Sequence, residues 1–193
     1  MAVSACSGTV STAVSPEASP PTQATATASP APGAPARGCT AKPTLAQTEG
    51  PYFKAGSPAK TNLVVPEMAG TALALTGHVL DARCAPVAGA MLDFWQADAS
   101  GAYDNSGYRL RGHQSAGSDG TYHLDTIIPG LYPGRTEHIH VKVARPGASP
   151  LTTQLYFPGV ARNQQDGIFD PSLLVNLSDS GGGKLATFDF VLG

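Results

Sequence analysis

The chain has 193 residues, of which 41% are hydrophobic and 13% are charged, and its formal net charge is -2 at pH 7. The length fits one domain with a hydrophobic core. The composition offers no basic stripe to neutralise phosphates and no run of 18 apolar residues, which argues against nucleic acid as a partner and against a membrane-spanning helix. A small uncharged or anionic metabolite remains open as a partner.

The N-terminal part of the chain differs in composition from the rest. Residues 7–37 are almost all Ala, Ser, Thr, Pro, Gly and Val, and Glu17 and Arg37 are the only charged residues among them. Such a segment buries too little apolar surface to offset the entropy of ordering it. We therefore expect a disordered tether over residues 1–38 and a folded domain over residues 39–193.

The first residues resemble a targeting signal. The stretch from Val3 to Cys6 reads V-S-A-C, like the end of a bacterial lipoprotein signal, in which small residues precede a cysteine that becomes lipidated. The basic and apolar part of such a signal is missing before it, as in a truncated signal peptide. We expect an exported protein, extracellular or anchored to a membrane at the cell surface through a lipidated Cys6. The alternative is an ordinary disordered N-terminus.

Two cysteines, Cys39 and Cys84, fall in the expected folded domain. In an exported protein they form the natural disulfide pair. Spacing along the chain does not fix the distance between two cysteines, so two unpaired, small buried residues remain the alternative.

From Thr71 onward the sequence predicts short β-strands separated by turns. Apolar residues alternate with other residues in four runs, at residues 73–79, 92–95, 151–157 and 188–192. Turn signals such as S-D-G, P-G and R-P-G separate the runs, and no segment has a helical stripe. We therefore predict an all-β fold, an antiparallel β-sandwich with long loops.

The segment from Pro129 to Val143 reads P-G-L-Y-P-G-R-T-E-H-I-H-V-K-V, and its last part alternates strictly. On a strand, His138, His140 and Lys142 lie on one face and the apolar residues between them on the other. The α-carbons of the two histidines are then roughly 7 Å apart, which is within reach of one shared metal ion.

A phenol and a guanidinium stand just before these histidines. Tyr132 and Arg135 lie in a loop rich in Pro and Gly, which can fold both groups over the same place. The segment is therefore a candidate metal centre that carries its own cation. From the two histidines alone, zinc or copper in a hydrolytic or redox site is one interpretation, and a solvated strand face is another.

Two further segments are rich in aromatic residues. Residues 48–53, T-E-G-P-Y-F, are too irregular for a strand and too aromatic for a plain linker, so we expect them to cross the domain and bring Tyr52 to a surface or a pocket. The loop after Trp95 carries Tyr103 and Tyr108, for which an amphipathic surface position is the ordinary interpretation.

Together these motifs resemble a known family. Over roughly residues 48–170 the chain contains, in order, T-E-G-P-Y-F, W-Q-A-D-x-x-G-x-Y, S-D-G-x-Y, P-G-x-Y-P-x-R-x-x-H-I-H and T-T-Q-L-Y-F. This order resembles the intradiol ring-cleavage dioxygenases, the catechol and protocatechuate 3,4-dioxygenase family, and especially their short, exported single-domain members. The spacing after Trp95 favours Tyr103 over Tyr108 as a ligand. The resemblance implies a mononuclear non-haem Fe(III) cofactor with the ligands Tyr103, Tyr132, His138 and His140.

The resemblance also implies roles for residues beside the ligands. Arg135 matches the active-site arginine of the family, and Gln154 in T-T-Q-L-Y-F matches a glutamine behind the ligands. Tyr52 and Trp95 are expected in the substrate pocket or next to the ligands. The remaining histidines are interpreted as structural or surface groups, namely His78, His113 and His123.

The chemistry of the ligand set agrees with this resemblance. Ferric iron is a hard cation and a phenolate is a hard anionic ligand, so two phenolates hold iron in the ferric state where two neutral imidazoles alone would not. Tyrosine has an ordinary pKa of ~10, so metal binding must displace the phenolic protons. The expected reaction is O2-dependent intradiol cleavage of a catechol-type aromatic to a muconate-type dicarboxylic acid, as a step of aromatic catabolism. Tyr132 is expected to leave the metal and take up a substrate proton, while Arg135 stabilises negative charge on the ring.

The substrate and the function class each have an alternative. The loop between Tyr132 and Arg135 is shorter than in members that act on hydroxylated benzoates, so catechol, substituted catechols, protocatechuate and hydroxyquinol all remain open as substrates. The alternative function is a non-catalytic β-sandwich module that binds carbohydrate or peptide at the end of a tether. That alternative explains the strands and Trp95, but it leaves the four expected ligands as a coincidence.

Overall fold

The computed structural model describes residues 1–4 and 39–193. The chain divides into two units, Met1–Ala31 and Pro32–Gly193. The described part of the first unit, residues 1–4, is exposed. The rest of the expected tether and the expected lipidation site at Cys6 lie outside the described residues.

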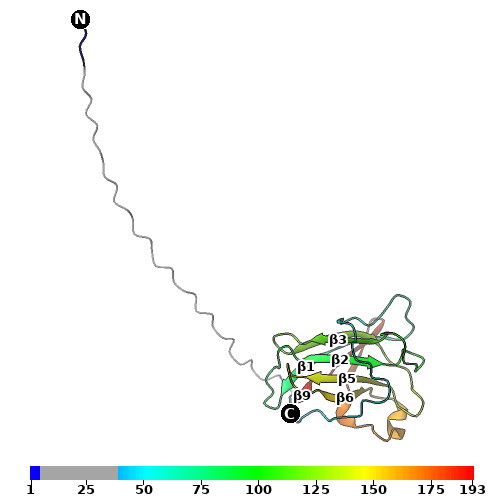
Figure 1. Cartoon of the computed structure of the whole chain (residues 1–193). Helices are drawn as coiled ribbons and strands as arrows, with labels where there is room; N and C mark the ends of the chain where they lie inside the picture. Colours follow the sequence, from blue (N-terminus) through cyan, green and yellow to red (C-terminus); the bar gives the residue numbers. More distant parts are fainter. Residues whose placement is uncertain (5–38) are drawn as a thin grey trace. The chain divides into compact units, whose positions relative to one another are not determined.

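The second unit is a sandwich of two β-sheets (Figure 1). One sheet has the order β4-β1-β8-β7, with β9 added beside the end of β1, and its strands are β1 (Ala72–Asp81), β4 (Thr121–Ile127), β7 (Asn176–Ser180), β8 (Gly183–Thr187) and β9 (Phe190–Leu192). The other has the order β3-β2-β5-β6, visible in Figure 1, and is made of β2 (Met91–Gln96), β3 (Arg111–Ser115), β5 (His138–Ala144) and β6 (Leu151–Tyr156).

Helix is confined to two short 3-10 turns in the described residues, η1 (Ala161–Gln165) and η2 (Pro171–Leu173). No helix of the described residues has the length and apolar character needed to cross a membrane. The prediction of an all-β sandwich is confirmed.

Most strand pairs are antiparallel, in line with the predicted antiparallel sandwich, but two of the pairs made by β1 are parallel. This strand pairs antiparallel with β4, but it pairs parallel with β8, from Ala72 opposite Gly183 to Thr76 opposite Thr187, and parallel with β9. Alternation in a sequence shows which residues share a face, but it does not show the direction of the partner strand. A long stretch of chain separates β1 from β8 and β9, so no hairpin turn constrains that direction.

Strand β5 lies in the interior of its sheet, between β2 and β6. Its apolar residues Ile139, Val141 and Val143 are fully buried in the core between the two sheets, as the alternation predicts. His138 and His140 point to the other face, yet each is only 3% exposed. The interpretation of a solvated histidine face is therefore wrong, because loops cover this face of the sheet.

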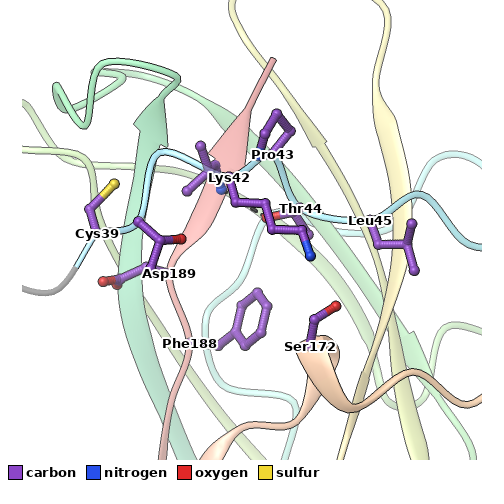
Figure 2. A pocket seen from close by; sticks show the side chains of 10 residues that line it. Cys39, Lys42, Pro43, Thr44, Leu45, Ser172, Phe188 and Asp189 are labelled. Atoms are coloured by element: carbon purple, nitrogen blue, oxygen red, sulfur yellow. Dashed lines mark hydrogen bonds between the residues drawn. The ribbon is translucent and has the colours of Figure 1, made fainter.

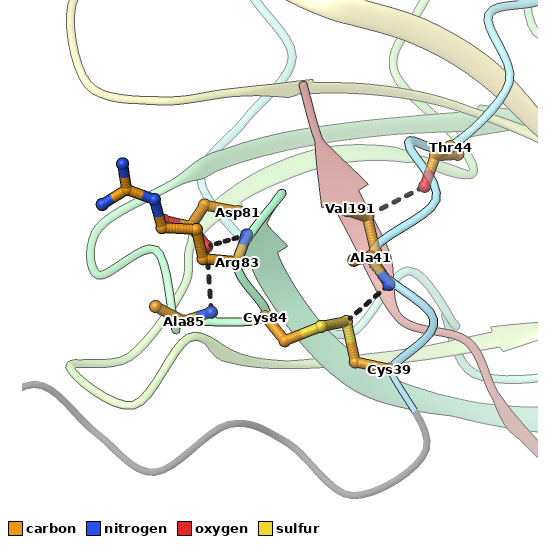
Figure 3. Close-up of a disulfide and its surroundings, with 8 residues drawn as sticks. All are labelled: Cys39, Ala41, Thr44, Asp81, Arg83, Cys84, Ala85 and Val191. Atoms are coloured by element: carbon orange, nitrogen blue, oxygen red, sulfur yellow. Dashed lines mark hydrogen bonds between the residues drawn. A yellow bond between two sulfur atoms is a disulfide. The ribbon is translucent and has the colours of Figure 1, made fainter.

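An N-terminal strap, defined as residues 39–54, is one of these covering segments. It begins at a disulfide between Cys39 and Cys84, with the sulfur atoms 2.07 Å apart (Figure 3), so the predicted pairing is confirmed. The Thr44 N–H then donates to the Val191 carbonyl at 2.9 Å, and the Gln47 N–H donates to the Thr152 carbonyl at 2.8 Å. The strap thus crosses the domain from the disulfide toward the histidines.

Candidate metal centre

The two histidines of β5 form the floor of the site. Their Nε2 atoms are 3.0 Å apart. The sheet register places Trp95 of β2 and Gln154 of β6 on either side of His140, and Tyr156 of β6 beside His138. Because β5 is hydrogen-bonded to a neighbouring strand on each edge, the sheet fixes the backbone positions of both histidines.

Both imidazoles are neutral in this environment. Burial lowers the pKa of His138 to about 4, although the hydrogen bond to the Thr136 carbonyl partly opposes this shift. Burial also lowers the pKa of His140 well below its ordinary value, and the nearby His138 adds to the effect. The His138 Nδ1 lies 2.6 Å from the Thr136 carbonyl oxygen, which requires the proton on Nδ1 and leaves a lone pair on Nε2.

Three tyrosines close over this floor. The Tyr103 hydroxyl lies 3.3 Å from His138 Nε2. The Tyr103 ring stacks on Tyr52 with centroids 4.5 Å apart and meets the edge of Tyr132 at 5.9 Å. The Tyr132 hydroxyl is 2.8 Å from that of Tyr52. The structure therefore brings Tyr52, Tyr103 and Tyr132 together at the histidines.

Tyr108 points away from this cluster. Its hydroxyl donates to the Ala55 carbonyl at 2.9 Å, and its ring lies under the Lys54 ammonium at 4.4 Å. The other histidines also lie elsewhere. A ring nitrogen of His78 lies near Asp189, one of His113 near Ser57, and one of His123 near Asp125.

The donor set fits a hard cation. The His138 Nε2 lone pair faces His140 Nε2 and the Tyr103 hydroxyl, so two nitrogen atoms and one oxygen atom that can bind a metal lie close together. Burial raises the pKa of the Tyr103 phenol well above its ordinary value, so a metal charge is needed to release this proton. Within residues 1–4 and 39–193, no group of three His, Cys, Asp or Glu could hold a metal. The side-chain oxygens that lie nearest to the two histidines are those of the phenols described above.

Arg135 is fixed beside the phenols by two partners. Its Nε donates to Asp166 Oδ2 at 2.8 Å, and its Nη2 donates to Gln154 Oε1 at 2.6 Å. Gln154 is fully buried, and its Nε2 donates to the Thr48 carbonyl of the strap at 2.8 Å. Gln154 therefore joins the guanidinium to the strap.

Sequence reasoning missed three residues that build the site. Asp166 holds Arg135, and the Tyr156 hydroxyl donates to Gln154 Oε1 at 3.0 Å. Arg111 is only 1% exposed; its Nη1 donates to the Tyr52 carbonyl at 2.6 Å and its Nε to the Asp104 carbonyl at 3.2 Å. Asp166 and Arg111 left no signal in the sequence, because an isolated charged residue reads as a surface group. Tyr156 stood in the T-T-Q-L-Y-F motif, which was the one available signal.

A separate pocket of about 170 Å³ lies at the beginning of the strap (Figure 2). Its lining includes Cys39, Lys42, Phe188 and Asp189, and none of the expected metal ligands is part of it. The candidate metal centre is therefore distinct from this pocket.

Known proteins resemble this chain in sequence and in fold. A family model described as "Dioxygenase" matches residues 48–192. The dioxygenase domain of a dioxygenase carbohydrate-binding protein fusion from the cellulolytic bacterium Streptomyces sp. SirexAA-E is 56% identical, with a TM-score of 0.77, over 78% of this chain and 98% of that one.

Curated relatives are more distant. Chlorocatechol 1,2-dioxygenase of Rhodococcus opacus is 30% identical over 60% of this chain. 6-Chlorohydroxyquinol 1,2-dioxygenase of Cupriavidus pinatubonensis is 31% identical over 80% of this chain. The matched regions span 57% and 65% of the length of these two relatives. With a family match over most of its length, the chain belongs to the intradiol ring-cleavage dioxygenase family.

Proposed function

We propose that this protein is an Fe(III)-dependent intradiol dioxygenase, which cleaves a catechol-type aromatic with O2 to a muconate-type dicarboxylic acid. The observation that carries the proposal is the convergence of two buried, neutral imidazoles and the Tyr103 hydroxyl on one place, with Tyr132 beside them. A non-catalytic binding module has no use for neutral histidines buried against phenols.

The proposed ligands of the iron are Tyr103, Tyr132, His138 and His140. When bound, ferric iron would act as a Lewis acid, which a catechol chelates through its two oxygen atoms and which draws electron density from the ring, so that the ring becomes reactive toward O2. The two imidazoles serve as fixed ligands because β5 is paired on both edges. The two phenols lie on loops outside the strands.

Tyr132 has the properties of the ligand that leaves when substrate enters. Its side chain is half-buried, and its hydroxyl is 2.8 Å from the hydroxyl of Tyr52, so a partner for the displaced phenol is already in place. The Tyr132 Oη then takes up a proton from the substrate hydroxyl. Tyr52 stabilises the displaced phenol by this hydrogen bond.

Arg135 acts on charge in the substrate. Its guanidinium is pinned by Asp166 and Gln154, so it presents a fixed positive charge at the site without reorganising during the reaction. Asp166 and Gln154, the two partners of Arg135, are not expected metal ligands. Removal of the guanidinium should therefore affect turnover more than metal binding.

The proposed substrate class is a single-ring catechol. The curated relatives named above act on chlorocatechol and chlorohydroxyquinol, as their names state. Comparison of kcat/KM for catechol, 4-chlorocatechol, hydroxyquinol and protocatechuate would rank the candidates.

The direct test is to load the purified protein with iron and supply catechol and labelled O2. We expect a metal content of one ferric ion per chain, a broad visible band from tyrosinate-to-iron charge transfer, and a diacid product that contains both labelled oxygen atoms. Iron binding without a visible band would contradict the tyrosinate ligands. Stronger binding of zinc or copper, with no ring cleavage, would favour the hydrolytic or redox alternative.

We also propose that the protein is exported. The Cys39–Cys84 disulfide supports this proposal, because disulfides persist mainly in oxidising compartments. Fractionation of the native host, with mass spectrometry of the N-terminal peptide for a lipid on Cys6, tests it. Recovery of the protein from the cytoplasm with both cysteines reduced would contradict it.

A further inference from the structure

The two histidines of the candidate metal centre are held in different ways. His138 Nδ1 is fixed by the Thr136 carbonyl at 2.6 Å. His140 Nδ1 is also buried, but among the described residues it has no hydrogen-bond partner. A ligating imidazole normally has its ring plane set by a hydrogen bond from its other nitrogen. The second side-chain torsion of histidine has only broad preferences, so another contact must set the plane of His140.

Trp95 supplies that contact. Its indole stacks on the His140 imidazole with ring centroids 4.8 Å apart and planes only 7° from parallel. The two residues are directly opposite each other in the β2–β5 register, so the sheet backbone sets their spacing. Trp95 is 1% exposed, which leaves its ring little freedom to move away.

The strap holds this stack from outside. Phe53 packs its ring against Trp95 with centroids 4.9 Å apart and planes at 62°. The Lys142 ammonium lies 3.7 Å from the Phe53 ring centroid and pairs with Glu49. The imidazole is therefore covered on this side by three layers of side chains, namely Trp95, Phe53 and Lys142. Each of these residues belongs to the strap or to the sheet.

The indole contributes its face and not its N–H group. Trp95 Nε1 is buried and has no hydrogen-bond partner among the described residues. A hydrogen-bonding role for this nitrogen would require a partner within reach, whereas a stacking role requires only the flat ring. This distinction makes phenylalanine a conservative replacement for Trp95 and leucine a disruptive one.

We propose that Trp95 is a positioning residue for His140, which sets the imidazole plane by stacking as Thr136 sets the plane of His138 by a hydrogen bond. The inference rests on the proposed function in one respect, namely that His140 Nε2 is a metal ligand. The consequence is that iron retention depends on the flat ring of Trp95.

Three variants of the full chain test this inference: Trp95→Leu, Trp95→Phe and, as a matched control, Phe188→Leu. The Phe188 ring lines the pocket in Figure 2 and packs against Phe190 with centroids 5.0 Å apart, so its truncation removes aromatic area from a different set of contacts. The measurements are the rate of iron loss to a chelator, the wavelength of the visible band and the melting temperature. Iron-free samples are also compared by NMR of the His140 ring nitrogens.

We expect Trp95→Leu to weaken iron retention by about 10- to 100-fold, the usual cost of losing a group that orients a metal ligand. It should also shift the visible band and, without iron, alter the His140 ring resonances. Trp95→Phe should restore most of the retention and the band position. Phe188→Leu should lower the melting temperature and leave retention and band unchanged.

Equal loss of iron in Trp95→Leu and Trp95→Phe, or unchanged retention in a folded Trp95→Leu protein, would overturn the inference. If Trp95→Leu does not fold, the comparison of Trp95→Phe with wild type decides, because a large loss of iron in Trp95→Phe contradicts a role for the ring face. The NMR comparison of iron-free samples separates this inference from the proposed function. A wild-type protein that binds no iron contradicts the function, whereas unchanged His140 resonances in Trp95→Leu contradict the stacking role.

Discussion

The floor and the wall of the candidate metal centre are built from different kinds of backbone structure. The floor is β5, whose histidines sit on a strand paired with β2 and β6 along its length. The wall is the pair of loops that carry Tyr103 and Tyr132, outside any strand. A strand in the interior of a sheet fixes side chains through its neighbours, whereas a loop needs anchors of its own. Under the proposed function, the protein thus combines two histidine ligands that stay in place with a tyrosine ligand that is able to leave.

The anchors of the wall are polar groups. Arg111 donates to the backbone carbonyls of Tyr52 and Asp104, which ties two covering segments together. The Asp104 carboxylate accepts N–H groups of Ser106, Gly107 and Arg109 and closes the loop after Tyr103. A small number of hydrogen bonds therefore holds the loops of the wall in place, whereas the pairing of a whole sheet holds the histidines of the floor.

The largest expected effect comes from removing a ligand of the floor. His138→Ala or His140→Ala should reduce iron affinity by more than about 100-fold, since even groups behind a ligand usually cost 10- to 100-fold. The fold should persist, because both side chains point away from the core between the sheets. Metal analysis after dialysis against a chelator, with circular dichroism as the control for folding, measures this. Full iron content in either variant would remove that histidine from the ligand set.

Removal of a phenol of the wall should have a different signature. Tyr103→Phe and Tyr132→Phe should each retain some iron but shift or weaken the visible band, and Tyr132→Phe should slow turnover severely because it loses the proton acceptor. Tyr108→Phe is the matched control and should leave the band in place, because its hydroxyl binds the Ala55 carbonyl. Absorption spectra of the three variants at equal iron content decide the assignment; bleaching in Tyr108→Phe would reverse it.

Arg135→Ala should separate catalysis from metal binding. We expect kcat to fall on the order of 10²-fold, the usual cost of losing one preorganised electrostatic group, while iron content and band stay near wild type. Steady-state kinetics with catechol, alongside metal analysis, measures the two effects in one preparation. Full activity in this variant would exclude Arg135 from the mechanism.

Removal of the disulfide tests how much the bridge at the beginning of the strap contributes to the stability of the fold. The bridge joins residues 45 positions apart, and loss of such a bridge typically costs ~2 to 5 kcal/mol of stability. We expect Cys39→Ser with Cys84→Ser to melt at a clearly lower temperature while still binding iron in the cold, since the floor does not involve the bridge. An unchanged melting temperature would contradict the stabilising role.

The smallest expected effect is a loss of stability at acid pH when the Asp166 carboxylate becomes protonated. Burial alone raises the pKa of this carboxyl, but hydrogen bonds from the Thr136 N–H and the Arg135 guanidinium outweigh it and leave the pKa below its ordinary value. A lowered pKa in the folded state means that the stabilisation is present above the unfolded value of about 4 and is lost as pH falls below it. The melting temperature of Asp166→Asn should therefore approach that of wild type at acid pH. A constant difference from pH 7 to 3 would contradict this.

The sequence by itself determined those features that depend on local periodicity and chemistry. Alternation predicted β1, β2, β5 and β6 and placed His138 and His140 on one face, because side chains on a strand alternate whatever the strand pairs with. The five motifs that follow one another over roughly residues 48–170, from T-E-G-P-Y-F to T-T-Q-L-Y-F, indicated the family. Two cysteines in the folded part offered one disulfide pair, with two unpaired residues as the alternative, and the structure contains the disulfide.

Only the tertiary structure decided which distant groups meet. The parallel pairing of β1 with β8, the burial of the histidines and the approach of the Tyr103 hydroxyl to His138 all depend on contacts between segments far apart in the chain. The same holds for Asp166 beneath Arg135 and for Trp95 stacked on His140. Such contacts leave no periodic trace, because a residue type and its neighbours in sequence do not specify what a loop or an adjacent strand will place against it.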